Sequence, residues 1–597
     1  MLRKTPVPIP EIRGKIYLVK ARNGIDVFVH YEYGRTYIKE KKYVKTHRKM
    51  IGKVCPDNPA MMWPNDNYFV FFPDEAEALV PIVDDSSRHH CIKCGSFILT
   101  SWILEDYGLK SWMQEHFGSL DGGLLLDLAS YMVVDESNVA QHYPAWAWER
   151  PLYSPDMHIY SDTKVARVLK HVDRDDVSGF IHWWNRDAKK KKDIVYLSYD
   201  STNKACQAGD IDLIEFGKAK VDLGQPIFNV TILYDIDANK PLAYEVYQGS
   251  IVDISQLKYM LEKPYGLGYR NIGIILDRGY FSKENINDMD DKGYSFVIMV
   301  KGCKNLVASL VMSVRGTFED SEKCWNKRYS MYGTTVEQKL YADDKKNRYF
   351  HIFYSPARAA AEQASFRTDL EKCEKVLENL KRTKSVKFKI NEDGGKYKYF
   401  DIEYGPRGNV VMYSPRNADI EAYIKLCGYF CIVSSDRMDA LKALEIYKSR
   451  DGSEKAFSWD KTFFGNNSMR SHTEEGLRGR TFISFIALII RCRIAKLIRD
   501  FVEADPAVRR KSCFSVPALI RELDKIVLLR TSSGKWTLEC SISARQKELF
   551  KMIGMDEKMV MNKLNILAHE MERIVQISDE SLVSDNEDFY SEEDEVI

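Results

Sequence analysis

The chain has 597 residues, 45% of them hydrophobic and 12% aromatic, which predicts a globular protein of several domains and excludes a mainly disordered one. The longest apolar run, Phe482 to Ile490, is far too short to span a bilayer, and the first residues lack the apolar segment of a secretory signal. We therefore expect a cytoplasmic protein with no membrane partner.

The net charge is only +1, but the two ends of the chain carry large charges of opposite sign. Residues 1–53 hold fourteen lysines and arginines against four acidic residues, whereas residues 579–597 hold nine acidic residues and no basic one. A basic arm suits contacts with phosphate groups. The acidic tail either competes for that arm or keeps the protein in solution, and its composition predicts disorder.

The first region along the chain is strand-like. Segments rich in β-branched and aromatic residues predict four strands within residues 15–72, the last of them YFVFF at 68–72. Asn23-Gly24 is a hairpin signal between the first two strands. Residues 95–190 then show helical periodicity.

Two cysteines stand out between these regions. Cys91 and Cys94 form a Cys-x2-Cys pair, but a structural zinc site needs four ligands and no second pair follows at a suitable spacing. We interpret them as ordinary loop or helix-start residues.

Residues 194–301 predict the element order β-β-β-α-β-α-β. The first strand, IVYLSYD, ends at Asp200, and the apolar run of the fourth, NIGIILDRGY, ends at Asp277. Residues 303–427 break the pattern, and strand GYFCIVSS at 428–435 resumes it. Parallel neighbours would bring the two aspartates to one edge of a sheet, although an acid after a strand is by itself an ordinary turn residue.

A helix predicted over about 438–462 carries the most specific pattern. Tyr447, Arg450, Glu454 and Lys461 are spaced by 3, 4 and 7 residues, so at 100° per residue they share a stripe about 60° wide. A charged stripe is usually a solvated face. The aromatic residue in the line and the phase held over its whole length favour a functional site instead.

The opposite side of this helix is apolar, and Leu441 and Leu444 are among the residues expected to face a core. Gly452 lies within the helix, where glycine costs about 1 kcal/mol relative to alanine. A bend at this glycine would move Glu454 relative to Tyr447, so the common stripe depends on a straight helix.

These motifs resemble those of a known family. The four residues of the stripe match the YREK signature of the DDE transposases of the insertion-sequence-4 type. YDSTN around Asp200 and LDRGYFSKENI around Asp277 resemble the first and second acidic motifs of that family, and GLRGRTFISFIALIIR at 476–491 resembles the block that follows the signature. Each motif alone is weak, but four in the correct order make residues 190–500 similar to this family.

The resemblance implies an α/β fold. Its centre would be a ribonuclease-H-like catalytic core, a mixed sheet flanked by helices, with a β-rich insertion domain and a preceding β-rich and helical region. The expected division of the chain is 1–94 as a basic β-rich region, 95–190 as a helical region that binds DNA, 191–302 as the first part of the catalytic core, 303–427 as the insertion domain, 428–500 as the second part of the core, 501–577 as a C-terminal region and 578–597 as the disordered acidic tail.

The resemblance also implies a DNA transposase that cuts an insertion sequence at its ends and joins it to a target. Asp200, Asp277 and Glu454 would form the catalytic triad. They would also be the metal ligands for two Mg²⁺ ions, or Mn²⁺, because hard cations prefer carboxylate oxygens and two such ions serve phosphodiester transfer.

The remaining signature residues, Tyr447, Arg450 and Lys461, are then expected to contact DNA phosphates. The implied partners are double-stranded DNA, both as the terminal inverted repeats of the element and as the target, and a second copy of the chain in a homodimeric synaptic complex. A nucleoid-associated location in the cytoplasm follows from these partners.

Two alternatives stay open. The first is a nuclease of the same fold that cuts DNA without strand transfer. The second is a domesticated DNA-binding protein that has kept the fold and lost the activity, against which the intact triad and signature argue.

Overall fold

The structure is a computed structural model. It describes residues 7–21, 26–38, 43–56, 58–72, 91–190, 193–208, 211–217, 224–251, 253–301, 304–344, 346–384, 395–458, 464–465, 468–504, 515–530 and 535–580. The predicted Asn23-Gly24 turn, Lys461 and most of the acidic tail lie outside these residues.

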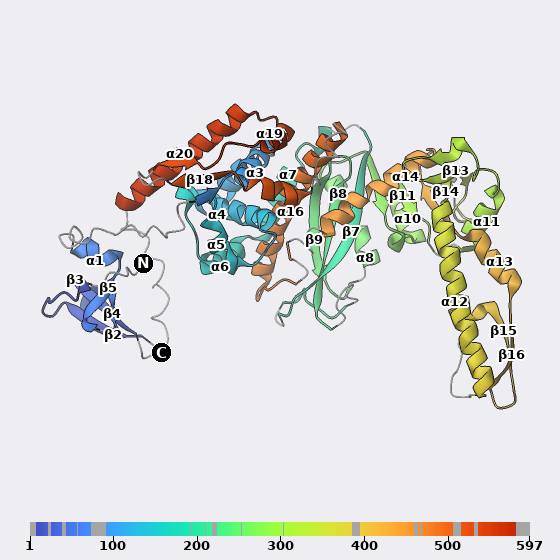
Figure 1. The fold of residues 1–597 in the computed structure, drawn as a ribbon, viewed down its shortest axis with the longest axis horizontal. Coiled ribbons are helices and arrows are strands. Elements are labelled where there is room, and N and C mark those ends of the chain that lie inside the picture. Colours follow the sequence, from blue (N-terminus) through green and yellow to red (C-terminus); the bar gives the residue numbers. More distant parts are fainter. Residues whose placement is uncertain are drawn as a thin grey trace.

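An antiparallel sheet with one helix forms the N-terminal module (Figure 1). Its strand order is β1-β5-β4-β3-β2. The elements are β1 (Val7–Pro8), β2 (Ile16–Lys20), β3 (Val27–Ile38), β4 (Tyr43–Cys55), β5 (Asn58–Pro64) and α1 (Asp66–Phe71). The prediction of a strand at YFVFF is wrong, because this segment lies in and just after α1. The Asn65 side chain starts that helix by accepting a hydrogen bond from the backbone N–H of Tyr68 (3.3 Å), whose side chain is buried.

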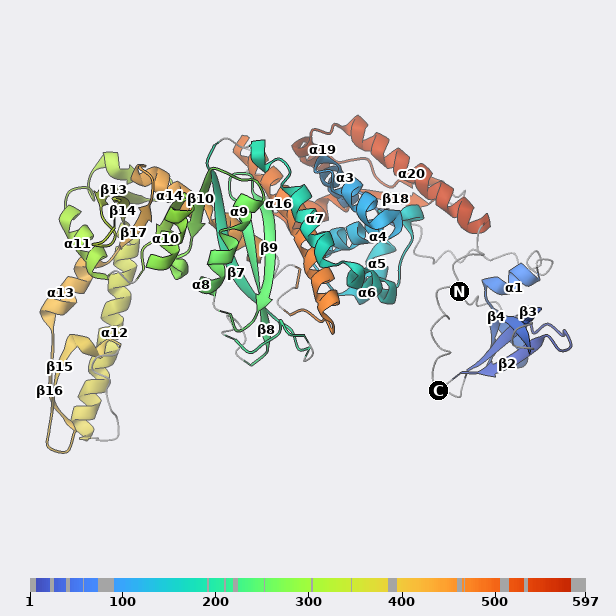
Figure 2. The ribbon, with the colours of Figure 1, turned by 180° about the vertical axis from the view of Figure 1, so that it is seen from behind.

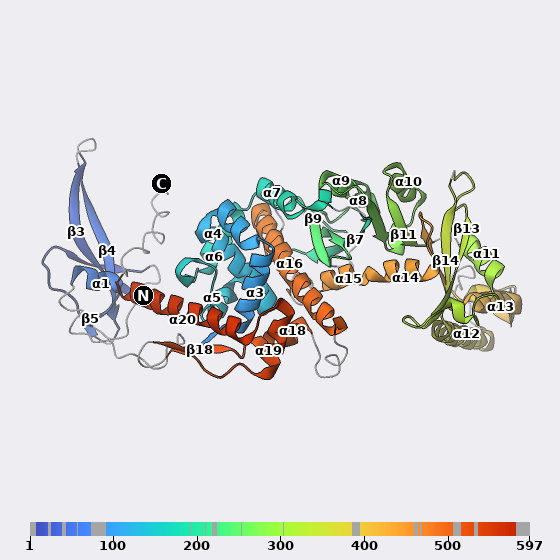
Figure 3. The same cartoon turned by 90° about the horizontal axis from the view of Figure 1, so that it is seen from above.

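A helical region follows and packs around one long apolar helix, α16 (Glu474–Ala504), as Figure 3 shows. Its members are α3 (Gly95–Asp106), α4 (Leu109–Val134), α5 (Tyr143–Ala147), α6 (Asp162–His171) and α7 (Arg174–Trp184). By length and composition α4 is apolar enough to cross a membrane, but 67% of its most apolar stretch is buried inside the protein, as in the core helix of a globular domain.

The central sheet has nine strands in the order β12-β13-β14-β17-β11-β10-β7-β8-β9. Strands β7, β8 and β9 pair antiparallel, while β10 pairs parallel to both β7 and β11. This order, with three antiparallel strands followed by two helical crossovers to β10 and β11, is that of a ribonuclease-H-like core. Its elements are β7 (Val195–Ala205), β8 (Ile227–Asp235), β9 (Lys240–Gln248), α8 (Asp253–Met260), α9 (Lys263–Gly266), β10 (Ile272–Leu276), α10 (Lys283–Asp291) and β11 (Ser295–Met299).

Both faces of this sheet are covered by helices. Ile232 and Ile275 lie in the core that includes α16, whereas their neighbours Leu233 and Ile274 lie in a second core with residues of α8 and α10. This alternation follows from the two-residue period of side chains along a strand. The helices on both faces exclude water from the centre of the sheet. Functional side chains are therefore expected at the ends of its strands.

Residues 304–427 divide into two parts (Figures 1 and 2). Strands β12 (Trp325–Asn326), β13 (Met331–Gln338) and β14 (Arg348–Tyr354) extend the central sheet through β17 (Tyr429–Ser434), beside α11 (Lys304–Val314). A branch projects from that end of the sheet and contains α12 (Pro356–Thr383), β15 (Phe400–Tyr404), β16 (Val410–Pro415) and α13 (Asn417–Leu426). Part of the expected insertion is therefore continuous with the core sheet.

The C-terminal elements return to the helical region. They are α18 (Val516–Leu523), β18 (Val527–Arg530), β19 (Trp536–Leu538), α19 (Ala544–Phe550) and α20 (Glu557–Glu580). The small sheet β19-β18-β6 joins them to β6 (Cys91–Lys93). Cys94 is buried and Cys91 exposed, and the described residues around them form no metal-binding cluster.

Short 3₁₀ helices complete the described chain. They are η2 (Ala140–His142), η3 (Pro155–Met157), η4 (Ala188–Lys190), η5 (Arg278–Tyr280), η6 (Glu322–Cys324), η7 (Tyr397–Tyr399) and η9 (Lys551–Ile553).

Candidate active site

Asp200 lies in β7, and Asp277 is the first residue after β10, the parallel neighbour of β7. The last pair in the register of β7 and β10 is Ser198 with Ile275, so Asp200 and Asp277 each lie two residues beyond that pair. The prediction that the first strand ends at Asp200 is wrong, because β7 continues to Ala205 while it pairs with β8. Asp200 therefore lies within the strand, where β7 still pairs with β8 but has passed its last pair with β10.

The segment that carries Asp277 is tied to the same strand. Asp277 is the N-cap of η5, where its carboxylate accepts a hydrogen bond from the next backbone N–H (2.6 Å). At the other end of η5, the buried Tyr280 places its hydroxyl 3.0 Å from Oγ of Ser201. Because Ser201 follows Asp200 directly, this contact fixes the distance between the two acidic motifs.

The predicted helix over 438–462 is two helices in direct succession, α14 (Ala440–Ser449) and α15 (Asp451–Ser458). Across the junction, the backbone N–H of Glu454 donates to the carbonyl of Arg450 at 3.3 Å. That bond is the usual helical step of four residues. Glu454 thus stays one turn beyond Arg450, as the spacing predicts.

Arg450 joins two of the three predicted acids. Its Nη1 lies 3.2 Å from Oδ1 of Asp277, and its Nη2 forms an ion pair with Oε1 of Glu454. Burial lowers the pKa of Arg450, but the Tyr447, Asp277 and Glu454 side chains and that of Asp200 outweigh it and raise this pKa. The arginine is therefore held as a cation among the acids.

Tyr447 does not lie on an open face. It is buried, and the Arg450 guanidinium carbon lies 5.4 Å from the centre of its ring. Burial raises the pKa of Tyr447, which keeps its hydroxyl protonated as a hydrogen-bond donor. On the other side of the helix Leu444 is buried as predicted, but Leu441 is 48% exposed, so the core reaches only part of that face.

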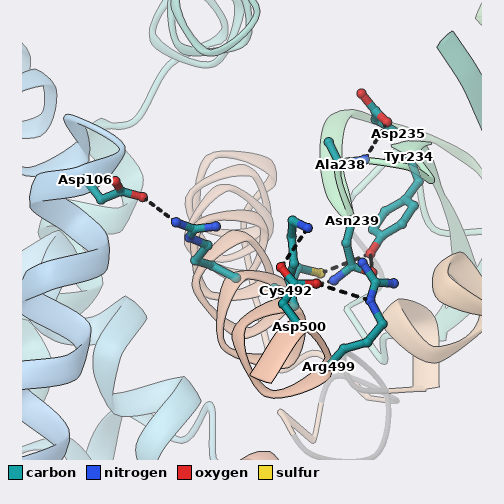
Figure 4. A network of polar contacts seen from close by, with 10 residues as sticks. Asp106, Tyr234, Asp235, Ala238, Asn239, Cys492, Arg499 and Asp500 are labelled. Carbon is teal, nitrogen blue, oxygen red and sulfur yellow. Dashed lines mark hydrogen bonds and ion pairs between the residues drawn. The ribbon is translucent and has the colours of Figure 1, made fainter. Parts of the chain in front are cut away.

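A network of hydrogen bonds joins the turn between β8 and β9 to α16 (Figure 4). In the turn between β8 and β9, Asn239 accepts a hydrogen bond from the Tyr234 hydroxyl (2.7 Å) and donates to the carbonyl of Cys492 in α16 (2.9 Å). A Cβ on Gly452 would lie 3.4 Å from the Tyr234 ring and 3.6 Å from the Asn239 amide oxygen. The glycine of the signature helix therefore packs directly on this network.

Sequence reasoning missed Asn239. Its φ of +53° is in the left-handed region, which asparagine adopts more readily than most residues. The Ala-Asn-Lys-Pro turn was the available signal, but a turn pattern does not reveal that the asparagine side chain reaches a distant helix.

A polar cleft of about 1130 Å³ runs beside α14 and α15. Arg450 and Glu454 line it, together with Arg328 from the segment before β13 and Arg499 from α16. Asp200 and Asp277 do not line it. The cleft thus brings cations from three separate parts of the chain next to one acid of the predicted triad.

The predicted metal ligands can be tested against this geometry. Within the described ranges, no three Asp, Glu, His or Cys side chains lie close enough to hold one metal ion together. Asp277 and Glu454 nevertheless share one cation, the guanidinium of Arg450, and their side chains are 42% and 46% exposed. Accessible carboxylate oxygens around a common positive charge fit the chemistry of Mg²⁺ or Mn²⁺.

Comparison with known proteins supports a transposase. Residues 199–490 match the family model described as the transposase DDE domain, a range that begins just before Asp200 and includes Asp277, Glu454 and about half of α16. The match covers just under half of the chain and supports a DDE transposase.

Among solved structures, the piggyBac transposase in a synaptic complex with hairpin DNA is similar, with 7% identity and a TM-score of 0.34 over 79% of this chain and 85% of that one. No curated protein matches the chain by sequence.

Proposed function

We propose that the protein is a cut-and-paste transposase of the insertion-sequence-4 type, which cleaves DNA at the ends of its element and joins those ends to a target. One observation carries the proposal. Asp200 and Asp277 each lie two residues beyond the last pair of two neighbouring parallel strands, and Arg450 links Asp277 to Glu454. Arg450 thus ties two of the three proposed catalytic acids together near the end of β10.

Asp200, Asp277 and Glu454 would hold the metal. When bound, two divalent ions supply an activated oxygen nucleophile and stabilise the leaving oxygen of the phosphodiester. The contribution of the protein is to hold three carboxylates on rigid elements: a central strand, a capped 3₁₀ turn and a helix.

The DNA contacts would come from the signature helix. Once Arg450 gives up its ion pairs with the acids, its planar fork is suited to a bidentate contact with a phosphate. Tyr447 donates its hydroxyl from a buried position beside it, and Lys461, which lies outside the described residues, would add a further positive charge. The partners are double-stranded DNA and a second copy of the chain, and the site of action is the nucleoid.

The decisive experiment is cleavage and joining with purified protein. The substrate carries the sequences that flank the coding region, and wild type is compared with Asp277→Ala in Mg²⁺. We expect cleavage and strand transfer by wild type and neither by the variant. Equal cleavage by Asp277→Ala would contradict the assignment of the triad. Cleavage without joining favours the nuclease, and DNA binding without cleavage favours the domesticated protein.

A further inference from the structure

The N-terminal module contains a two-stranded ribbon that extends beyond its sheet. Strand β2 pairs with β3 only as far as Tyr31, and β5 pairs with β4 only from Gly52 onward. Beyond Glu32 of β3 and Arg48 of β4, the two strands pair only with each other among the described residues. This pairing continues to the last described pair, Ile38 opposite Tyr43. Figure 3 shows the two strands running past the rest of the module.

Both faces of this ribbon are open. Tyr37 and Val44 stand opposite each other on one face and are 57% and 50% exposed, and Tyr43 on the other face is 46% exposed. A lone pair of strands is only marginally stable in water, and exposed aromatic residues add no stability until something covers them. The outer ribbon therefore has the composition of a contact surface rather than of a core.

Its charge is strongly positive. The described parts of the ribbon beyond Glu32, residues 33–38 and 43–49, hold four lysines and arginines and no acidic residue. At the base of the ribbon the buried carboxylate of Glu32 pairs with Arg35 and Arg48 and accepts a hydrogen bond from the Tyr17 hydroxyl (2.8 Å). This cluster anchors the ribbon to β2, because Arg48 also lies over the Tyr17 ring at 3.6 Å.

Beyond this cluster, no acidic side chain among the described residues pairs with Lys45. Lys45 is exposed and pairs with Thr36 across the strands. The hydroxyl of Thr36 contacts Nε2 of His47 at 2.8 Å on the same face. Hydroxyl, imidazole and ammonium groups thus alternate with aromatic rings along a narrow basic ribbon.

We propose that this β3–β4 ribbon binds duplex DNA by entering a groove, with the Tyr37 face against the sugar or base edges and the long side chain of Lys45, on the opposite face, reaching a phosphate beside the groove. The inference rests on the proposed function for its substrate, DNA. The major groove of B-form DNA is wide enough for a two-stranded β-ribbon, and lysines beside the ribbon then face the phosphates that line the groove.

The test is DNA binding by the full chain. Lys45→Ala and Tyr37→Ala are compared with Lys20→Ala, which removes an exposed lysine of the same module from β2 outside the ribbon. Binding to a duplex of arbitrary sequence is measured over a series of salt concentrations, and thermal unfolding shows that each variant is folded. We expect both ribbon variants to bind several-fold more weakly than wild type. Lys45→Ala should also reduce the slope of log affinity against log salt by about 1.

The outcomes separate the two proposals. Unchanged affinity in both ribbon variants, or an equal loss in Lys20→Ala, would overturn the ribbon proposal and leave the transposase proposal standing. A change of oligomeric state without a change in DNA affinity would also overturn it. Wild-type protein that binds no DNA would instead count against the proposed function itself.

Discussion

Arg450 reaches Asp277 across the space between the signature helix and the end of β10, with 3.2 Å between Nη1 and Oδ1. The same guanidinium pairs with Glu454, so one cation lies between two acids that are distant in sequence. In this arrangement the arginine keeps the carboxylates from repelling each other. A divalent ion at the same acids would compete with it for them.

The first prediction concerns this competition. Arg450→Ala should lower both the unfolding temperature and the unfolding free energy of the metal-free protein. The loss of unfolding free energy should be roughly 1 kcal/mol or less, because the acids are partly exposed and solvent screens their charges. Added Mg²⁺ should then raise the unfolding temperature of the variant more than that of wild type. Thermal unfolding in EDTA and in Mg²⁺ measures both effects.

Arg450→Lys is the matched control for charge. It keeps a cation but loses the two-pronged guanidinium, so it should retain most of the stability and lose most of the DNA cleavage. Equal responses of wild type and Arg450→Ala to Mg²⁺ would show that metal and arginine do not share these acids.

Asn239 provides the second prediction. Asn239→Ala removes the bond to the Cys492 carbonyl and leaves the buried Tyr234 hydroxyl with only the weak acceptor Sγ of Cys492 at 3.8 Å, which should destabilise the protein by about 1–3 kcal/mol. Because Gly452 packs on this pair, DNA cleavage should fall as well.

Asn239→Gly separates the two causes. It relieves the positive φ but still lacks the amide, so a glycine variant as active as wild type would mean that backbone conformation, not the side chain, positions α15. Chemical denaturation and the cleavage assay together provide the comparison.

Gly479 gives a prediction about packing. A Cβ at this position would lie 1.9 Å from the carbonyl oxygen of Leu169, so Gly479→Ala must push α16 away from α6. We expect destabilisation by about 1–3 kcal/mol or more.

Gly179, in α7, is the matched control, because no atom lies within 4 Å of a Cβ added there. Gly179→Ala should therefore stabilise the protein by about 1 kcal/mol. Chemical denaturation of both variants tests the pair, and equal effects would contradict the close contact.

The fourth prediction is a pH dependence of stability. Asp127 is completely buried, and burial raises its pKa to about 7 although Tyr153 and Ser154 donate hydrogen bonds to it. Since this pKa is higher in the folded chain than in the unfolded one, folding favours the protonated form. The contribution of protonated Asp127 to the unfolding free energy is complete below about pH 4 and is lost as the pH rises through about 7.

As the pH rises from about 4 to about 7, the unfolding free energy of wild type should therefore decrease relative to that of Asp127→Asn. The decrease should be up to about 1.4 kcal/mol per pH unit. Denaturation at several pH values measures the difference. Parallel curves for the two proteins would show that Asp127 does not titrate in this range.

Much of the site was predictable because its signals are local. The apolar run before Asp277 and the spacing from Arg450 to Glu454 depend only on the periods of strand and helix. The strand at YFVFF was predicted wrongly for the same reason. Its residue types suit a strand, but the cap at Asn65 and the burial of Tyr68 select a helix.

Local sequence patterns are enough to predict the order of strands and helices around Asp200, the presence of three acids in the family order, and the helical step that sets Glu454 one turn beyond Arg450. Long-range contacts instead put Asp200 and Asp277 two residues beyond the same strand pair, bury Tyr447 and join β14 to the core sheet. Strand register and burial depend on hydrogen bonds and contacts with partners far away in the chain, which no local pattern contains.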